Sequence, residues 1–336
     1  MIYDCFTFFN ELDLLEIRLN VLKDVVDKFV LVESDRTFTN RPKELIFEKN
    51  KARFAAFADK IIHIVVKDYP EYTSPWIYES IQRNHIADGL KDAKPDDWVL
   101  VSDIDEIPNP DKVCECAKTK GSAFVFCQRY YAYYLNYVNV RNPRWWGLKM
   151  LSYADFCHAL DGVKVVYDDF LPEALNQGTT ASKIRMRGLP KMRKVFNGGW
   201  HFTSLGGVAA VIEKLKSYSH QEHCNDSWRY DPVSVERMIQ DGKSPGLKMN
   251  CFAVKIDASF PQYIRDNQSK YANLIFEVTP QYLKRVWMGR FFRTFQGIII
   301  YAIERVLLST GIHRQLHRLR VWVREWCKRL FDKDLV

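Results

Sequence analysis

The chain has 336 residues, of which 47% are hydrophobic, 14% aromatic and 27% charged, and its net charge is +8. This composition excludes a disordered, collagenous or disulfide-stapled chain, and the length suits one large α/β domain or two smaller ones. The excess charge lies at one end: residues 281–336 hold 12 Lys and Arg against 4 Asp and Glu, while the first 280 residues hold 37 of each. We therefore expect no nucleic-acid partner for the main domain.

The cysteines and the N-terminal sequence indicate in which cellular compartment the protein is expected. Several of the eight cysteines lie in apolar runs, which is typical of reduced, buried thiols. The N-terminus shows no basic segment followed by an apolar one, so a signal peptide is not expected. A spanning helix is not expected either, because it would need about 18 uninterrupted apolar residues. The sequence therefore predicts a cytoplasmic protein.

Apolar runs and helical patterns alternate through the first half of the chain. A helix is predicted to begin at Asn10, with Asp13 as its capping-box partner, and another to cover Ser80–Leu90. Nearly continuous apolar strands that alternate with helices indicate a mostly parallel sheet with helices on both faces. The predicted strands are Ile2–Phe9, Lys28–Glu33, Lys60–Val66 and Trp98–Ser102.

The second half is less regular. It contains a Tyr-rich stretch at 130–137, a basic loop at 183–194, a strand-like run at 198–202 and a helix near 208–218. From Gln281 the apolar residues follow a helical period with flanking arginines, and a second basic helix follows Gly311. The sequence thus predicts a main domain, residues 1–280, followed by a basic amphipathic helical tail, residues 281–336.

An acidic motif follows the fourth predicted strand. Asp103 and Asp105 are spaced i, i+2, so in an extended chain both carboxylates point to the same side, and Ile104 points into the core. They lie at the carboxyl edge of the sheet, where open α/β sheets bind ligands. Carboxylate oxygens in this place suit Mg²⁺ or Mn²⁺. The alternative is a solvated acidic turn that caps the helix beginning near Pro110.

Four segments, in order, resemble glycosyltransferase family 17 over roughly residues 1–275. The resemblance implies a GT-A-type fold, a UDP-sugar donor carrying GlcNAc, a divalent metal and inversion at the anomeric carbon. It also implies that residues 1–280 form a catalytic domain. The segments are Tyr3-Asp-Cys-Phe-Thr-Phe-Phe-Asn-Glu-Leu-Asp-Leu-Leu-Glu-Ile-Arg-Leu, Phe29-Val-Leu-Val-Glu-Ser, Ser102-Asp-Ile-Asp-Glu-Ile-Pro and Gly199-Trp-His-Phe.

The same resemblance assigns roles to the acidic residues. Asp103 and Asp105 match the metal- and phosphate-binding Asp-x-Asp, and Glu106 matches the acid that orients them or binds the donor sugar. His201 matches the family's Gly-Trp-His, and a neutral imidazole can be a third ligand to Mn²⁺. The alternative for His201 is a histidine satisfied within the core. Glu222 is the favoured catalytic base among Asp155, Asp168, Asp169, Glu173, His220 and Glu222.

Further candidates for donor binding lie near the carboxyl edge of the sheet, where a ligand is expected. One more lies in the basic loop, where a cation could neutralise the departing diphosphate. Asn10 is equally explained as a helix cap, and the two helical candidates as ordinary surface residues. Aromatic residues at 130–137, with Trp145 and Trp146, could stack on sugar rings or pack in the core. The donor-binding candidates are Asn10, Glu11, Glu33, Arg83, Asn84 and Arg187.

The predicted function is metal-dependent, inverting transfer of a sugar from a UDP-sugar to a hydroxyl of a glycan, glycolipid or glycoprotein acceptor. A sugar nucleotidyltransferase is an alternative, but it needs a basic Gly-rich loop after the first strand. A non-catalytic carbohydrate- or membrane-binding protein is another. The tail, residues 281–330, fits an interfacial helix on the inner face of an anionic membrane, or a helix that packs on the main domain.

Overall fold

The computed structural model describes residues 1–67, 69, 74–119, 121–158, 181–189, 191–221, 227–244, 249–280 and 282–283. The chain divides into two compact units, Met1–Phe276 and Glu277–Val336. Nearly all of the predicted tail, residues 281–336, lies outside the described residues. Within the described ranges, no helix has the length and hydropathy needed to cross a bilayer.

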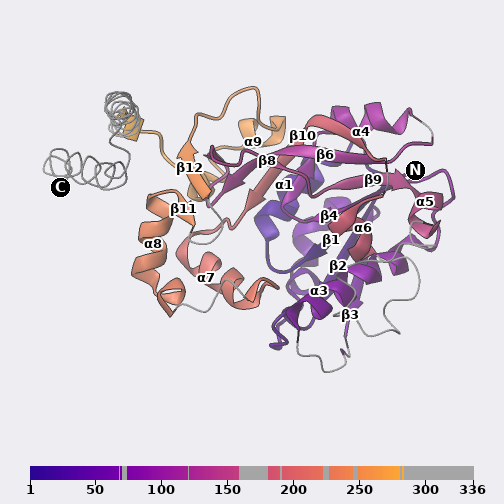
Figure 1. Cartoon of the computed structure of the whole chain (residues 1–336), viewed down its shortest axis with the longest axis horizontal. Coiled ribbons are helices and arrows are strands. Elements are labelled where there is room, and N and C mark those ends of the chain that lie inside the picture. Colours follow the sequence, from indigo (N-terminus) through magenta and orange to yellow (C-terminus); the bar gives the residue numbers. More distant parts are fainter. Residues whose placement is uncertain are drawn as a thin grey trace, which may run out of the picture. The chain divides into compact units, whose positions relative to one another are not determined.

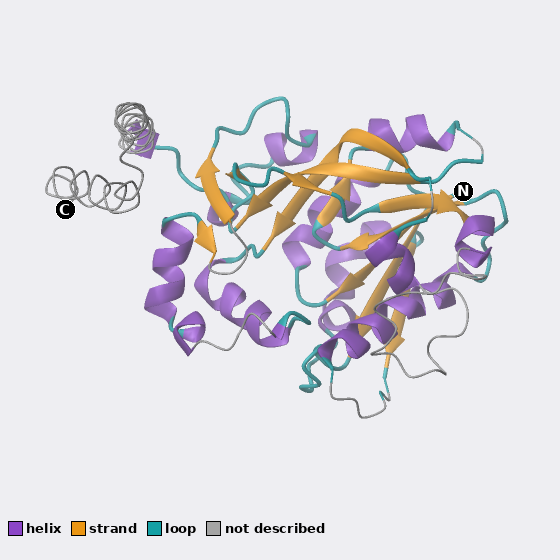
Figure 2. Cartoon of the chain, viewed as in Figure 1, coloured by secondary structure: helices purple, strands orange, loops and turns teal. Residues whose placement is uncertain are grey.

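The first unit has the α/β architecture predicted from the sequence, with helices beside a large sheet (Figures 1 and 2). The strands are β1 (Ile2–Phe8), β2 (Lys28–Ser34), β3 (Ile61–Val66), β4 (Trp98–Asp103), β5 (Glu106–Pro108), β6 (Phe124–Ala132), β7 (Tyr137–Asn139), β8 (Arg144–Trp145), β9 (Lys149–Ser152), β10 (Arg193–Thr203), β11 (Lys243–Ser244) and β12 (Met249–Ala253). The helices are α1 (Leu12–Leu22), α2 (Ile46–Asn50), α3 (Pro75–Asn84), α4 (Pro110–Ala117), α5 (Tyr153–His158), α6 (Ala181–Arg187), α7 (Gly207–Ser217), α8 (Pro232–Gln240) and α9 (Gln262–Asp266).

The sheet is mixed, and its order places a ligand-binding crevice. Strands β3, β2, β1 and β4 are adjacent in that order and parallel, whereas β9, β6, β7, β12 and β11 continue the sheet through antiparallel pairs. The chain runs from β1 outward to β3 and then returns to the other side of β1 for β4. Open sheets bind ligands at the carboxyl ends of the strands where the order reverses in this way. Here that point lies between β1 and β4.

Alternation along the parallel strands supplies a core on each face of the sheet, because successive side chains point to opposite sides. Tyr3 and Cys5 belong to a buried cluster that includes Ile184 of α6. Phe6 belongs to a second cluster that includes Leu15 of α1. The prediction of helices on both faces of the parallel strands is therefore confirmed.

Three local predictions need correction. The second helix runs over Pro75–Asn84 and continues as a 3₁₀ helix to Leu90, earlier than predicted. Asn10 does not cap α1: the N-cap position is Glu11, whose carboxylate instead accepts hydrogen bonds from the main-chain N–H groups of Phe9 and Asn10. The basic segment 183–194 is a loop only in its middle, because buried Ile184 anchors α6, which ends at Arg187, and β10 begins at Arg193.

Candidate active site

The acidic motif forms a tight turn between β4 and β5. Asp103 ends β4, Glu106 begins β5, and residues 104–105 are the turn between them. A buried guanidinium holds this turn: Arg18 Nη1 donates to the carbonyl oxygens of Asp103 at 2.8 Å, Ile104 at 3.1 Å and Glu106 at 3.1 Å. The Ile104 side chain is buried among core residues, as predicted. The backbone carrying the carboxylates is thus fixed by α1.

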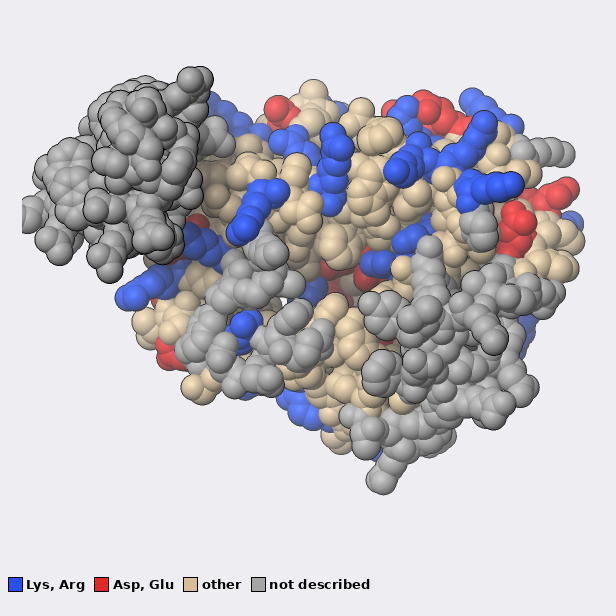
Figure 3. All heavy atoms as spheres, in the orientation of Figure 1, with Lys and Arg blue, Asp and Glu red and all other residues tan. Residues whose placement is uncertain are grey.

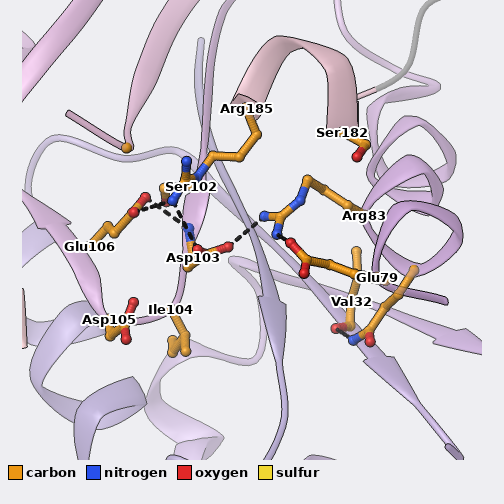
Figure 4. A network of polar contacts seen from close by, with 12 residues as sticks. Val32, Glu79, Arg83, Ser102, Asp103, Ile104, Asp105, Glu106, Ser182 and Arg185 are labelled. Atoms are coloured by element: carbon orange, nitrogen blue, oxygen red, sulfur yellow. Dashed lines mark hydrogen bonds and ion pairs between the residues drawn. The ribbon is translucent and has the colours of Figure 1, made fainter. Parts of the chain in front are cut away.

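Asp103 is enclosed by two arginines (Figure 4). Arg83 Nη1 of α3 lies 2.5 Å from Asp103 Oδ1, and Arg185 Nη2 of α6 lies 2.9 Å from Oδ2. Arg83 also pairs with Glu79 at 2.6 Å. Burial opposes ionisation of Asp103, but the charges of Arg185 and Arg83 outweigh it and hold the pKa of Asp103 well below its usual value. Asp103 is therefore a carboxylate at neutral pH.

Glu106 lies beside Asp103 and Arg185 and joins them to the ring of Trp145. Its side chain is fully buried, and one oxygen receives hydrogen bonds from Arg185 and from Trp145 Nε1. The other oxygen accepts from the Asp103 main-chain N–H at 3.1 Å. Glu106 therefore links Asp103, Arg185 and Trp145 through hydrogen bonds, and its role in orienting the aspartates or binding a donor sugar stays a prediction.

Asp105 lies apart from this network (Figure 4) and has different partners. Lys214 Nζ of α7 is 3.1 Å from Oδ2, and His201 Nε2 of β10 is 3.4 Å from Oδ1. Burial raises the pKa of Asp105, but the Lys214 charge and then His201 lower it well below the usual value. The sequence predicted an extended chain in which both carboxylates point to the same side; instead the chain turns at residues 104–105, and the two aspartates line the same cavity with different partners.

His201 is held between two aromatic rings. The centroid of its ring lies 4.8 Å from that of Tyr130 and 4.5 Å from that of Trp145, both in stacked geometry. Its Nδ1 is buried and has no hydrogen-bond partner among the described residues. Stacking, rather than hydrogen bonding, therefore points Nε2 at Asp105, and these two aromatics serve the site through packing.

The two aspartates and the direct partners of their carboxylates line one cavity of about 370 Å³ at the carboxyl edge of β1 and β4, and Arg18 and Glu106 lie outside its lining. Carboxylates show in a hollow near the middle of the visible face in Figure 3, with basic side chains around it. Charged side chains from four different elements and aromatic rings thus face a common space. The charged lining includes Glu11, Glu79, Arg83, Asp103, Asp105, Arg185 and Lys214, and the aromatic lining includes Trp76, Tyr130 and Trp145.

The remaining predicted donor-binding residues are placed as follows. Asn10 is exposed and, like Glu33, does not line the cavity. Glu33 is buried beside His63, at 3.2 Å, and accepts from the Phe47 N–H at 2.9 Å. Asn84 accepts from the Ser182 N–H at 3.1 Å and so ties α6 to α3. Arg187 ends α6, but its side chain, like the whole of Glu222, lies outside the described residues.

Sequence reasoning did not single out three basic residues that complete the site. Arg185 was only one of several cations in the supposed loop, yet it contacts both Asp103 and Glu106. Lys214 and Arg18 each lie on a helix. Arg18 carries a usable signal, because it lies four residues from both Leu14 and Leu22 and so places a charge on an apolar helix face. Lys214 carries none, because lysines are ordinary in a surface helix.

The side chains of the cavity that could ligate a metal suit a cation that is also bound by a phosphate. Among the described residues, no group of three or more His, Cys, Asp and Glu side chains is arranged to hold a metal. Among the residues that line the cavity, Asp105 and His201 form one possible pair of ligands, with Oδ1 of Asp105 3.4 Å from Nε2 of His201. Mg²⁺ in phosphate-handling sites is usually held by one or two carboxylates plus the substrate phosphates. Asp105 and His201 therefore fit a metal completed by a diphosphate, rather than one caged by protein.

Comparison with known proteins supports the resemblance found in the sequence. The model of glycosyltransferase family 17 matches residues 1–155. The β-1,4-mannosyl-glycoprotein 4-β-N-acetylglucosaminyltransferases of Homo sapiens and Rattus norvegicus are 33% identical to this chain over 112 residues. That segment is 31% of this chain and only 21% of each relative. The chain thus matches about a fifth of their length.

Two solved structures show weaker likeness. The mannosyltransferase PcManGT of Pyrobaculum calidifontis, in complex with GDP-Man and Mn²⁺, is 14% identical with a TM-score of 0.34, covering 99% of this chain and 87% of that one. Glucosyl-3-phosphoglycerate synthase of Mycobacterium tuberculosis is 12% identical with a TM-score of 0.33, covering 79% and 91%. Likeness at this level carries no argument about this chain. The resemblance to glycosyltransferase family 17 is confirmed over residues 1–155, the part of the chain that holds Asp103, Asp105 and Glu106.

Proposed function

We propose that this chain is a glycosyltransferase that moves a sugar from a UDP-sugar to an acceptor hydroxyl. One observation carries the proposal: the family match covers the carboxylate turn of Asp103 and Asp105, and this turn faces a cavity of about 370 Å³ lined by cations and aromatic rings. Cations suit a diphosphate and aromatic faces suit pyranose rings. The names of the matched relatives support GlcNAc as the sugar and a glycan as the acceptor.

The metal in this proposal is Mn²⁺ or Mg²⁺, held by Asp105 and His201 together with the donor phosphates. When bound, it would act as a Lewis acid on the departing diphosphate. Arg83 and Arg185 keep Asp103 ionised beside it. Arg18 and Glu106 keep the turn in place, so this chain positions the carboxylates before any ligand arrives.

The transfer is a single displacement. The acceptor oxygen forms a bond to the anomeric carbon as the bond from that carbon to the diphosphate oxygen breaks, and the electron pair leaves with UDP. The acceptor proton passes to a base. Among the predicted bases, His220 lines the cavity, while Asp155 accepts from Ser152 at the start of α5 and does not line it. Glu222 stays a prediction outside the described residues.

A sugar nucleotidyltransferase is less well supported. It would need a basic, Gly-rich loop after β1, and Glu11 occupies that place on the cavity wall. A non-catalytic carbohydrate-binding protein would use the aromatic wall without needing Asp105. The two classes are separated by testing whether Asp105 matters for turnover.

The test is release of UDP from a panel of UDP-sugars, without acceptor, in Mn²⁺ and in EDTA. We expect UDP-GlcNAc to be hydrolysed above the others in Mn²⁺ only. Asp105→Ala should reduce this rate on the order of 100-fold, as for loss of other groups that stabilise developing charge. The matched control Asp24→Ala removes an exposed aspartate and should change nothing. Failure of every donor, together with UDP binding that ignores Mn²⁺, would favour the binding protein.

Membrane association remains a separate part of the proposal. The segment 281–330 lies outside the described residues apart from Tyr282 and Leu283, and its net charge and apolar stripe are the support. Flotation of the full chain with anionic and with neutral vesicles tests it. Binding to anionic vesicles that is lost in high salt is expected for a peripheral cytoplasmic protein. Equal recovery with both vesicles, or with neither, contradicts it.

A further inference from the structure

Lys214 is hydrogen-bonded to the carboxylate oxygen of Asp105 that a bound metal would need as a ligand. Its Nζ donates to Asp105 Oδ2 at 3.1 Å and to Thr203 Oγ1 at 2.9 Å. The other Asp105 oxygen faces His201 Nε2 at 3.4 Å. The carboxylate that fits the metal is therefore already paired with a cation of the chain.

The surroundings of this pair permit the ammonium to move. The Lys214 side chain is 32% exposed and lines the cavity, whereas the Asp105 side chain is only 9% exposed. The carboxylate is fixed on its turn, and the lysine reaches it from α7 on a flexible stem. A partly exposed ammonium can exchange one anionic partner for another with water solvating it in between, at a lower cost than a buried one.

The local charge shows why a metal and a diphosphate need each other here. Asp103, Glu79 and Glu106 are joined through Arg83 and Arg185 in one ion-paired cluster, and Asp105 pairs with Lys214 beside it. These four carboxylates face three cationic side chains, and the cavity lining adds one carboxylate, Glu11, and two guanidinium groups, Arg36 and Arg229. These side chains therefore have no surplus positive charge to bind a diphosphate. A divalent ion that arrives alone is repelled by Lys214, which is paired with the carboxylate of Asp105 that the ion would bind.

We propose that Lys214 is a placeholder cation that couples metal binding to diphosphate binding. This inference rests on the proposed function. A nucleoside diphosphate offers the ammonium phosphate oxygens as new partners, which frees Asp105 for the metal that arrives with it. Each ligand therefore raises the affinity of the other, and by linkage the factor is the same in both directions.

The test is calorimetry on the full chain with Mn²⁺ alone, UDP alone in EDTA, and both together. For the wild type we expect a coupling factor within the range of about 5–150 that is common for linked sites. Lys214→Met should bind Mn²⁺ alone about tenfold more tightly, because the repelling charge is gone, and its coupling factor should fall about tenfold.

Two further variants keep this result interpretable. Lys216→Met removes the same charge from an exposed position of the same helix, over the Tyr230 ring, and should leave both quantities unchanged. Lys214→Gln also removes the charge but can still hydrogen-bond to Thr203. It takes the place of Lys214→Met if that variant does not fold, and the same changes in Mn²⁺ affinity and coupling factor are expected. Circular dichroism establishes that each variant is folded.

The outcomes separate this inference from the proposed function. Equal Mn²⁺ affinity and equal coupling in the wild type and in folded Lys214→Met overturn the placeholder role while UDP binding with Mn²⁺ stands. Absence of UDP binding in every variant, with or without Mn²⁺, overturns the proposed function, and the placeholder role with it.

Discussion

Arg18 is predicted to be the main support of the acidic turn, and Arg18→Met tests this. Its guanidinium donates to both oxygens of Asp4, at 2.7 and 2.6 Å, and to Ser102 Oγ at 2.6 Å. Its remaining nitrogen holds three carbonyl oxygens of the turn. Methionine keeps most of the apolar stem and loses every one of these contacts.

The expected magnitude follows from burial. Both side chains of the Arg18–Asp4 pair are 0% exposed. Removing one partner of such a pair leaves an uncompensated buried charge, which typically costs about 3–5 kcal/mol. Since whole domains unfold at about 5–15 kcal/mol, Arg18→Met should lose a large share of the stability. The affinity for UDP with Mn²⁺ should fall too, because the turn loses its support.

Urea unfolding followed by circular dichroism measures this change. Arg53→Met is the control: its partners on α1, Asp13 and Glu16, are partly exposed, so it should lose at most about 1 kcal/mol. The double variant Asp4→Leu with Arg18→Met should be more stable than Arg18→Met alone, because no lone charge remains. A loss below about 1 kcal/mol in Arg18→Met, or a double variant that loses the sum of both single losses, refutes the reasoning.

Two further predictions concern the wall behind Asp103. Gly147→Ala would place a methyl group against Glu106 Oε1 and Trp145 Nε1, which are joined by a hydrogen bond. We expect a stability loss of about 1–3 kcal/mol and weaker Mn²⁺-dependent UDP binding in calorimetry. Unchanged binding would show that the hydrogen bond between Trp145 and Glu106 is dispensable. Burial, and then Arg185, lower the pKa of Lys149 to about 7. Between about pH 7 and about pH 10 the unfolded chain therefore binds a proton that the folded chain does not, and wild-type stability should rise relative to Lys149→Met by about 1.4 kcal/mol per pH unit in urea unfolding. A flat difference would mean that the Lys149 amine stays charged when folded.

The cavity is built from segments whose proximity no local pattern encodes. Arg185 reaches Asp103 across 82 residues of sequence, and Lys214 reaches Asp105 across 109. Arg185 lies in α6, which packs on α3 and β4, and Lys214 lies in α7, which packs on α8. From the sequence, Arg185 was expected in a basic loop that could neutralise the departing diphosphate, and Lys214 in a helix near 208–218, with no partner assigned to either.

The sequence by itself determined the parallel strands and the place of the acidic motif. Runs such as Trp98–Ser102 are apolar throughout because both faces of the strand are covered, and a carboxylate that follows such a run must lie at the carboxyl edge. Residues 1–155 also carry the family pattern, on which the proposed role of Asp103 and Asp105 rests. These are properties of neighbours along the chain, so local sequence is enough to predict them.

Only the tertiary structure decided how the carboxylates are used. It turned the chain after Asp103, so that Asp103 pairs with arginines while Asp105 pairs with His201 and Lys214. It also placed Glu33 in a buried network away from the cavity. The physical reason is that the partner of a buried charge is chosen by the packing of whole elements, since any cation brought within reach relieves the cost of burial.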